Sequence, residues 1–200
     1  MFDDTYKTIS APSTGIFKDK GSKFIAYIYP VNSEAEIKEI IISLKKEHHS
    51  ARHYCYAYCL LPDKSIYRSN DDGEPSGTAG KPILGQIKSS DLTDILVVVV
   101  RYFGGTLLGV SGLIKAYKSA TWDAINNSEI IVKSINEIIE ISCSYELLND
   151  VMHIVKQERL HIIRQESIGN RITMNLEIRK GIFEKVHGLL KKKEGIEITN

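Results

Sequence analysis

The stretch from Ile95 to Gly112 reads Ile-Leu-Val-Val-Val-Val-Arg-Tyr-Phe-Gly-Gly-Thr-Leu-Leu-Gly-Val-Ser-Gly. Its first six residues are apolar and include four consecutive valines, which is typical of a strand buried on both faces of a sheet. Glycines follow, and from Val110 to Asn126 small and apolar residues recur at helical spacing. The stretch therefore predicts a strand over 94–102 that is buried on both faces, a glycine-rich turn and a helix that packs closely on the sheet.

The residues before this stretch predict further sheet and helix elements. Ser33 and Glu36 form a capping-box pattern, and apolar residues then recur at helical spacing from Ile37 to Leu44. This predicts a helix that ends near His48 and His49. The segment Arg52 to Leu61 alternates tyrosines with small residues, so it predicts a strand whose small side packs against a helix. The other elements expected here are a strand over 24–31, a hairpin strand over 65–68 and a short helix over 83–88.

The last third of the chain has a different pattern, which reads βαββαβ from Ile135 onward. Apolar and polar residues alternate without exception from Arg171 to Arg179, so one sheet face there is buried and the other polar. Gly169 and Asn170 supply a hairpin turn. The order matches a ferredoxin-like split βαβ unit. We therefore expect an α+β protein with two domains, residues 1–133 and 134–200.

Composition limits the classes of function. The 26 Lys and Arg residues balance 25 Asp and Glu, so any nucleic-acid binding has to come from a local patch. Three cysteines without disulfide-framework spacing suit a reducing compartment. No signal-peptide pattern follows Met1, and the apolar run from Ile95 to Val100 is far shorter than the roughly 20 residues that span a bilayer. We expect a soluble, cytoplasmic protein with no membrane partner.

Two glycine-rich segments are the candidate functional site. The strand, glycine turn and helix over 95–126 offer backbone N–H groups to an anion, or else their glycines only permit close packing. The segment Ser69 to Pro82, which we name the signature loop, reads Ser-Asn-Asp-Asp-Gly-Glu-Pro-Ser-Gly-Thr-Ala-Gly-Lys-Pro. Neither segment is a dinucleotide fingerprint or a P-loop, because Thr106, Pro75 and Pro82 occupy positions those motifs reserve for other residues.

The acids of the signature loop, Asp71, Asp72 and Glu74, admit three interpretations. We favour solvated, turn-forming acids. Cation ligands and a paired-carboxylate catalytic site are the alternatives, although no partner nucleophile is visible. The histidines and cysteines within residues 48–59 could also form a zinc site or supply a cysteine nucleophile. We favour the simpler interpretation that these cysteines are packed in the core. We predict no catalytic residue, no metal and no cofactor.

The tyrosines at positions 54, 56 and 58 share one strand face, with basic residues nearby in the sequence. Such a face suits stacking on single-stranded nucleic acid, while the alternative is that the tyrosines fill the edge of the core.

These segments together resemble the YigZ/Impact family. The resemblance rests on the signature loop, on Val-Val-Val-Val-Arg-Tyr-Phe-Gly-Gly, and on Leu-Gly-Val-Ser-Gly-Leu-Ile-Lys-Ala-Tyr, and it covers roughly residues 16 to 128. The segment His53-x-Cys55-x-Ala57-Tyr58 also fits. The tail from Ser134 resembles the ferredoxin-like domain of bacterial YigZ members, which is similar to a domain of elongation factor G.

The resemblance implies an N-terminal domain of the left-handed βαβ kind shared by ribosomal and elongation-factor domains. It also implies a link to translation, since Impact restrains a stress kinase by competing for its activator. Bacterial members are inferred to bind nucleic acid. The family supplies no catalytic residue to carry over.

We therefore predict a non-enzymatic, translation-related regulator that binds RNA or a ribosome-associated protein, without DNA sequence specificity. The alternatives are an enzyme acting on a phosphorylated small molecule or nucleotide, and a purely protein-binding regulator. The predicted ligand contacts are Lys81, Arg101, Tyr102, Gly104, Gly105, Gly109, Ser111 and Lys115. The signature loop contributes Asp71, Asp72, Gly73, Glu74, Pro75, Gly77, Thr78 and Gly80, and the supporting strand contributes Arg52, His53, Tyr56 and Tyr58.

Overall fold

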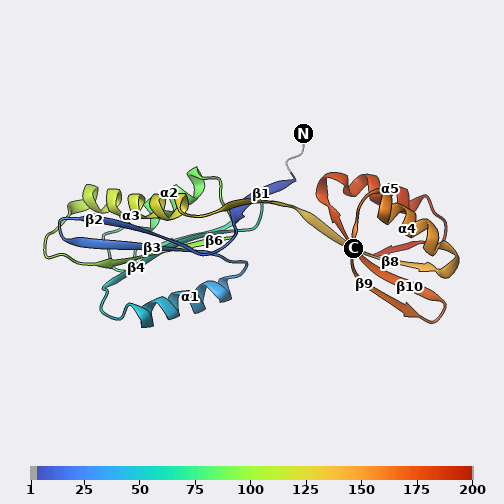
Figure 1. Cartoon of the computed structure of the whole chain (residues 1–200), viewed down its shortest axis with the longest axis horizontal. Coiled ribbons are helices and arrows are strands. Elements are labelled where there is room, and N and C mark those ends of the chain that lie inside the picture. Colours follow the sequence, from blue (N-terminus) through green and yellow to red (C-terminus); the bar gives the residue numbers. More distant parts are fainter. Residues whose placement is uncertain (1–3, 200) are drawn as a thin grey trace. The chain divides into compact units, whose positions relative to one another are not determined.

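The computed structural model describes residues 4–199, and their helices and strands form two compact units (Figure 1). One unit comprises Tyr6–Lys133. The other comprises the described residues 134–199 together with Asp4 and Thr5. The predicted α+β class is confirmed. Within the described part of the chain, no helix has both the length and the apolar character that crossing a membrane requires.

The first unit is built on a five-stranded sheet in the order β2-β3-β6-β4-β5. Its strands are β2 (Ser13–Asp19), β3 (Ser22–Pro30), β4 (His53–Leu60), β5 (Ile66–Asn70) and β6 (Ile95–Tyr102). Every neighbouring pair in this sheet is antiparallel. The six residues from Ile95 to Val100 are fully buried in its centre. The four-valine run is therefore the buried strand that the sequence predicts, and the structure places it at the centre of the sheet.

Helices cover both faces of this sheet (Figure 1). Helix α1 (Glu34–Glu47) lies on one face, and α2 (Gly80–Ser89) and α3 (Gly109–Asn126) lie on the other. The predicted capping pattern starts α1, because the Ser33 hydroxyl accepts a hydrogen bond from the Glu36 backbone N–H at 3.3 Å. Helix α1 ends before His48, as predicted.

Small side chains let α3 lie close to the sheet. Cys55, Ala57 and Cys59 of β4 are fully buried on the side of α2 and α3, which confirms the predicted small face. On the edge strand β2, a Cβ atom at Gly15 would lie 2.2 Å from the Ala124 backbone nitrogen of α3. Only a residue without a side chain allows this approach of strand and helix.

Some elements differ from the predictions. The strands β1 (Thr5–Ile9) and β7 (Ile130–Ser134), which pair as a separate two-stranded sheet, and the edge strand β2 were not predicted. Strands β1 and β2 keep much of their length exposed and mix polar with apolar residues, so they lack the apolar runs that identify buried strands. Strand β7 does contain the apolar run Ile130 to Val132, which the prediction overlooked. Helix α2 begins at Gly80, three residues before the predicted start at Ile83.

The second unit contains the predicted βαββαβ order. Its elements are β8 (Asn136–Ser144), α4 (Leu148–Gln157), β9 (His161–Ile168), β10 (Arg171–Arg179), α5 (Phe183–Lys191) and β11 (Glu197–Thr199), with the short 3₁₀ helices η1 (Tyr145–Leu147) and η2 (Lys180–Ile182) leading into α4 and α5. The antiparallel sheet has the order β11-β8-β10-β9, and both helices pack on one of its faces (Figure 1). The alternation along β10 is confirmed, since its four apolar side chains are buried.

Candidate functional site

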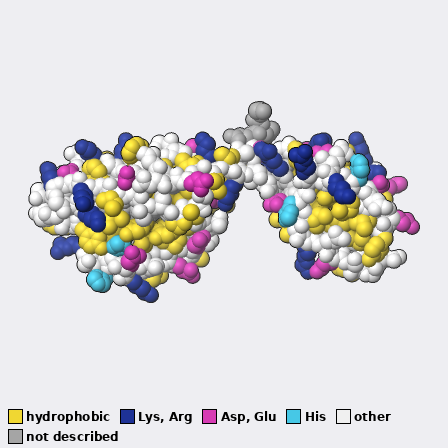
Figure 2. Space-filling model, in the orientation of Figure 1, with side chains coloured by type: hydrophobic (Ala, Val, Ile, Leu, Met, Phe, Trp, Pro, Cys, Tyr) yellow, Lys and Arg dark blue, Asp and Glu magenta, His cyan; other side chains and the backbone are white. Residues whose placement is uncertain are grey.

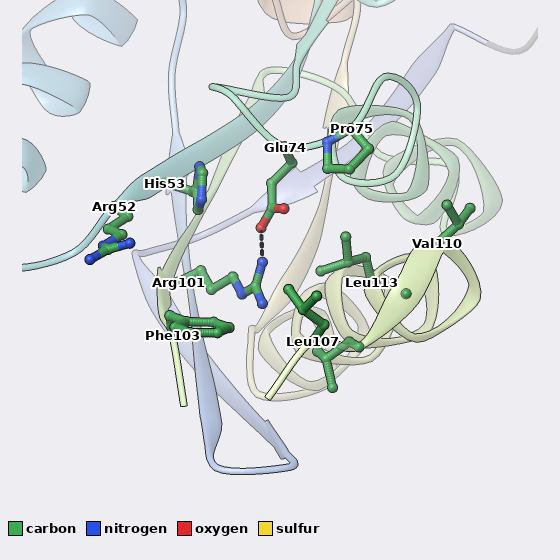
Figure 3. Close-up of a pocket in the computed structure, with 11 residues that line it drawn as sticks. Arg52, His53, Glu74, Pro75, Arg101, Phe103, Leu107, Val110 and Leu113 are labelled. Atoms are coloured by element: carbon green, nitrogen blue, oxygen red, sulfur yellow. Dashed lines mark hydrogen bonds and ion pairs between the residues drawn. The ribbon is translucent and has the colours of Figure 1, made fainter. Parts of the chain in front are cut away.

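A cavity of about 400 Å³ lies in the first unit where β4 begins, β6 ends and α3 begins. We name it the Arg101 cavity (Figure 3). Its walls come from the signature loop on one side and from the glycine-rich turn after β6 on the other. The lining residues are Arg52, His53, Glu74, Pro75, Arg101, Phe103, Leu107, Leu108, Gly109, Val110 and Leu113. The fold thus brings the two glycine-rich segments to one site.

The Arg101 guanidinium lies deep in this cavity, and the residue is only 5% exposed. Figure 3 shows its side chain extending between Glu74 above and Phe103 below. Nη1 donates to Glu74 Oε1 at 2.5 Å, and the guanidinium carbon lies 5.6 Å from the centre of the Phe103 ring. Nε is buried without a hydrogen-bond partner among the described residues. Glu74 therefore neutralises the charge of Arg101 but leaves one of its donors unused.

Glu74 is buried, so our interpretation of it as a solvated turn acid is wrong. Its Oε1 atom also accepts a hydrogen bond from the Tyr117 hydroxyl of α3 at 2.8 Å. Burial raises the pKa of Tyr117 far above its usual value, so the hydroxyl keeps its proton and donates it to Glu74. Glu74 thus connects the signature loop to β6 and α3 through two buried donors.

Asp71 stabilises the start of α2. Its carboxylate accepts hydrogen bonds from the backbone N–H groups of Gly77 at 2.9 Å, Ala79 at 3.0 Å and Gly80 at 2.8 Å. Burial alone would raise the pKa of Asp71, but these three donors hold it below the usual 3.8. Because Ala79 cannot cap the helix with its own side chain, Asp71 does so from earlier in the chain.

Asp72 holds the signature loop against β4. Its Oδ2 atom accepts a hydrogen bond from the Tyr54 backbone N–H at 2.7 Å, and its carbonyl oxygen accepts one from His53 Nδ1 at 2.9 Å. Asp71, Asp72 and Glu74 therefore each bond to different internal groups. The described side chains include no group of three or more His, Cys, Asp and Glu arranged to hold a metal ion.

The glycines of the turn after β6 have two separate roles. Gly105 and Gly109 have φ angles of +86° and +71°, with open space where a Cβ atom would lie. At Gly104, in contrast, a Cβ atom would lie 1.9 Å from the carbonyl carbon of Gly21 in the turn between β2 and β3. Gly104 is thus required for close backbone packing, and the other two glycines for turning the chain into α3.

The contrast between these glycines gives a testable prediction. We expect Gly104→Ala to lower the free energy of unfolding by about 2 kcal/mol, because the backbone of Gly21 has to move. The matched variant Gly105→Ala meets no atoms and carries only left-handed backbone strain, about 1 kcal/mol. Urea denaturation of both variants checks this order. A larger loss of stability for Gly105→Ala than for Gly104→Ala would show that the close approach of Gly104 to Gly21 does not contribute to stability.

The predicted ligand-contact residues do not all lie at one site. Arg101 and Gly109 line the Arg101 cavity together with Arg52, His53, Glu74 and Pro75 of the other predicted groups. Tyr102 lies on the opposite sheet face, where its hydroxyl is 2.8 Å from His48 Nδ1. Lys81, Ser111 and Lys115 are exposed on α2 and α3 outside the lining of the cavity.

The tyrosine face of β4 is not a stacking surface, so the stacking interpretation is wrong, and the tyrosines instead pack in the core. Helix α1 covers Tyr54 and Tyr58, which leaves Tyr58 only 4% exposed. The Tyr58 hydroxyl donates to Glu34 of α1, and burial followed by this contact raises the pKa of Tyr58 to about 12. On the other face, burial raises the pKa of the Cys55 thiol far above its usual range, which makes Cys55 a poor nucleophile.

The sequence did not identify the apolar rim of the Arg101 cavity. Phe103, Leu107 and Val110 are exposed there, with Leu107 exposed to 81%. The available signal was that large apolar side chains lie in and beside a glycine-rich turn, outside the buried stripe of α3. Together with Arg52, this rim surrounds the opening to the Arg101 guanidinium with apolar and positively charged groups.

Comparison with known proteins identifies the family to which the chain is similar. Residues 20–125 match the Impact N-terminal domain. The chain is 38% identical over 138 residues to IMPACT family member YvyE of Bacillus subtilis, covering 69% of this chain and 64% of that protein. It is 37% identical over 150 residues to IMPACT family member YigZ of Escherichia coli, covering 74% of each.

Two further similarities cover different shares of the chain. Protein IMPACT of Xenopus laevis is 38% identical over 96 residues, which are 46% of this chain and 30% of that protein. A crystal structure of a hypothetical protein has a TM-score of 0.73 at 30% identity, and the match covers 98% of this chain and 96% of that one. The chain therefore belongs to the Impact family, and its residues 20–125 form the Impact N-terminal domain.

Proposed function

We propose that this protein is a non-enzymatic, translation-related regulator that binds RNA or a ribosome-associated partner at the Arg101 cavity. Membership of the Impact family, which includes Protein IMPACT of eukaryotes, supports the link to translation. Binding, rather than catalysis, is supported by how the polar groups of the site are used.

The observation that carries this proposal is the unused donor of Arg101. A buried N–H group without a hydrogen-bond partner costs free energy, and an acceptor on a ligand removes that cost. Beside it, α3 begins at Gly109 without a side-chain cap, so its first N–H groups attract negative charge. A volume of about 400 Å³ lies within the range of small-ligand sites. The cavity suits a group of nucleotide size with an acceptor or anionic end.

The carboxylates of the signature loop support a binding role over catalysis. Asp71, Asp72 and Glu74 accept hydrogen bonds from internal donors that hold the loop in shape. A general acid or base needs a carboxyl group that can reach a substrate and exchange its proton. Protonating Asp71 would weaken the start of α2, so its chemistry is tied to the fold.

Surface charge also favours a local site. On the face shown in Figure 2, Lys and Arg side chains are spread around the molecule and mixed with Asp and Glu. No broad basic field appears on that face, in line with a net charge of +1. Exposed cations next to the two glycine-rich segments, such as Arg52 and Lys81, are therefore the candidates for phosphate contact.

The test is ribosome co-sedimentation and filter binding of RNA. We expect the double variant Arg52→Glu, Lys81→Glu to bind about tenfold more weakly than the wild type. Its salt dependence should also be shallower, by about 0.7 in the logarithmic slope for each lost contact to a single strand. Both side chains are exposed, so the fold is retained, whereas replacing the buried Arg101 would disturb it.

The matched control is Lys38→Glu, Lys46→Glu, which makes the same charge change on the exposed side of α1, across the sheet from the cavity. It should bind like the wild type. Equal binding by both double variants, or no binding of RNA or ribosomes by the wild type, would contradict the proposed function.

A further inference from the structure

Helix α3 carries an exposed stripe of two lysines and the single tryptophan of the sequence. Its members are Ser111, Lys115, Lys118 and Trp122, which follow one another at spacings of four, three and four residues. At about 100° per residue these spacings place all four on one face of the helix, within about 60°. We name them the α3 stripe. The opposite side of α3 packs on the sheet.

Trp122 is 57% exposed, although tryptophan is highly buried on average in folded proteins. Its indole ring is therefore available to a ligand. Lys115 and Lys118 are exposed as well, and neither takes part in an ion pair within residues 4–199. The neighbouring acid, Asp123, is engaged elsewhere, since its Oδ2 atom accepts a hydrogen bond from the Ile16 backbone N–H of β2 at 2.8 Å. The stripe thus combines free positive charge with an accessible aromatic face.

This combination fits single-stranded nucleic acid better than duplex or protein. Bases of a single strand can stack on an aromatic ring while lysines contact the phosphates. A duplex keeps its bases stacked on one another and does not offer a base face to Trp122. A protein interface instead enriches aromatic and Arg residues and depletes Lys at its core.

The stripe also leads to the site already described. Ser111 lies in the first turn of α3, next to Gly109 and Val110, which line the Arg101 cavity. Along the helix axis, Lys115 and Lys118 are about 4.5 Å apart, and Lys118 and Trp122 about 6 Å. A strand that follows the stripe therefore reaches the cavity, where the α3 N-terminus and Arg101 Nε offer donors to an anionic or acceptor group.

We propose that α3 binds single-stranded RNA along this stripe. Trp122 stacks on one base, Lys115 and Lys118 contact phosphates, and the strand continues into the Arg101 cavity. This inference rests on the proposed function and names its ligand and its path.

The experiment uses the full chain and an unstructured single-stranded RNA of about ten nucleotides. Because Trp122 is the sole tryptophan, its fluorescence reports on the stripe alone. We expect the single strand to quench it and a duplex of the same length to leave it unchanged. By polarisation of labelled RNA, Trp122→Ala should bind about tenfold more weakly, while Trp122→Phe keeps most of the affinity.

The charge test uses Lys115→Glu, Lys118→Glu with Lys38→Glu, Lys46→Glu of α1 as the matched control. All four side chains are exposed, so both variants should fold. We expect the stripe variant alone to weaken binding and to lower the logarithmic salt slope by about 1.4.

The outcomes separate this inference from the proposed function. In one outcome, RNA or ribosomes are bound and Arg52→Glu, Lys81→Glu weakens binding, but Trp122 fluorescence and the stripe variants show no effect. The proposed role of the α3 stripe is then wrong, and the proposed function stands. If ribosomes are bound but free RNA is not, and Trp122→Ala binds ribosomes like the wild type, the partner is a protein. The proposed role of the α3 stripe in binding RNA is then also wrong. If neither RNA nor ribosomes are bound, the proposed function itself fails.

Discussion

Glu74→Ala is expected to lower the free energy of unfolding by about 3–5 kcal/mol, the loss typical of breaking a buried ion pair. The substitution leaves the Arg101 guanidinium buried without a counter-charge, at a position that is 5% exposed. It also removes the acceptor of the Tyr117 hydroxyl. Urea denaturation followed by circular dichroism measures the loss.

The double variant Glu74→Leu, Arg101→Met separates the buried charge from the packing. It removes both charges, so no uncompensated ion remains, and replacing a buried ion pair by apolar residues is often neutral. We expect it to be more stable than Glu74→Ala by about 2 kcal/mol. The single variant Tyr117→Phe should cost about 2 kcal/mol, because its hydroxyl donates a hydrogen bond to the Glu74 carboxylate and accepts a weak one from Cys55 Sγ. A loss below about 1 kcal/mol for Glu74→Ala would contradict the role of the pair.

Asp71→Ala is expected to lower the free energy of unfolding by about 3 kcal/mol, because three backbone donors at the start of α2 lose a charged acceptor. Helix α2 should then fray toward Ile83, where the sequence pattern alone starts it. The loss of amide protection at Gly80 in hydrogen exchange measures this directly. Glu39→Ala, which removes an exposed acid from α1, should leave stability within about 0.5 kcal/mol of the wild type.

The contribution of Asp71 should depend on pH in a defined direction. Its pKa is lower in the folded protein than the usual 3.8, so the folded state favours the ionised form. The stability difference between wild type and Asp71→Ala is therefore fully present above about pH 4 and shrinks as the pH falls through the folded-state pKa. Urea unfolding at a series of pH values measures it. A difference that stays constant down to about pH 2 would show that the charge of Asp71 is not used.

Much of the fold could be predicted because its helices and strands follow from the periodic spacing of apolar residues along the chain. The four valines of β6, the capping pattern of α1 and the alternation along β10 each depend on residues close in sequence, and all three elements appear as predicted. The missed strands β1, β2 and β7 lie at edges or in a small separate sheet. Half-exposed strands such as β1 and β2 need few apolar residues, so their sequences carry a weak signal.

The candidate site could be predicted only in part. The segments that form the Arg101 cavity were identified, because glycines and prolines mark shaped loops. The roles of individual side chains were not. The burial of Tyr58 depends on where α1 lies, and the early start of α2 depends on an aspartate nine residues before Gly80. Such relations join residues that a periodic pattern does not connect.

By itself, the sequence of this protein determined the βαββαβ order of the second unit, most elements of the first unit, the burial of β6 and membership of the Impact family. The tertiary structure alone decided that Glu74 neutralises Arg101 from 27 positions away, that the loop acids stabilise the fold, and that Trp122 stays exposed. The physical reason is the distance along the chain over which each interaction acts. Periodicity acts between neighbours along the chain, whereas burial and charge pairing depend on distances in space that exist only once the sheet and helices have packed.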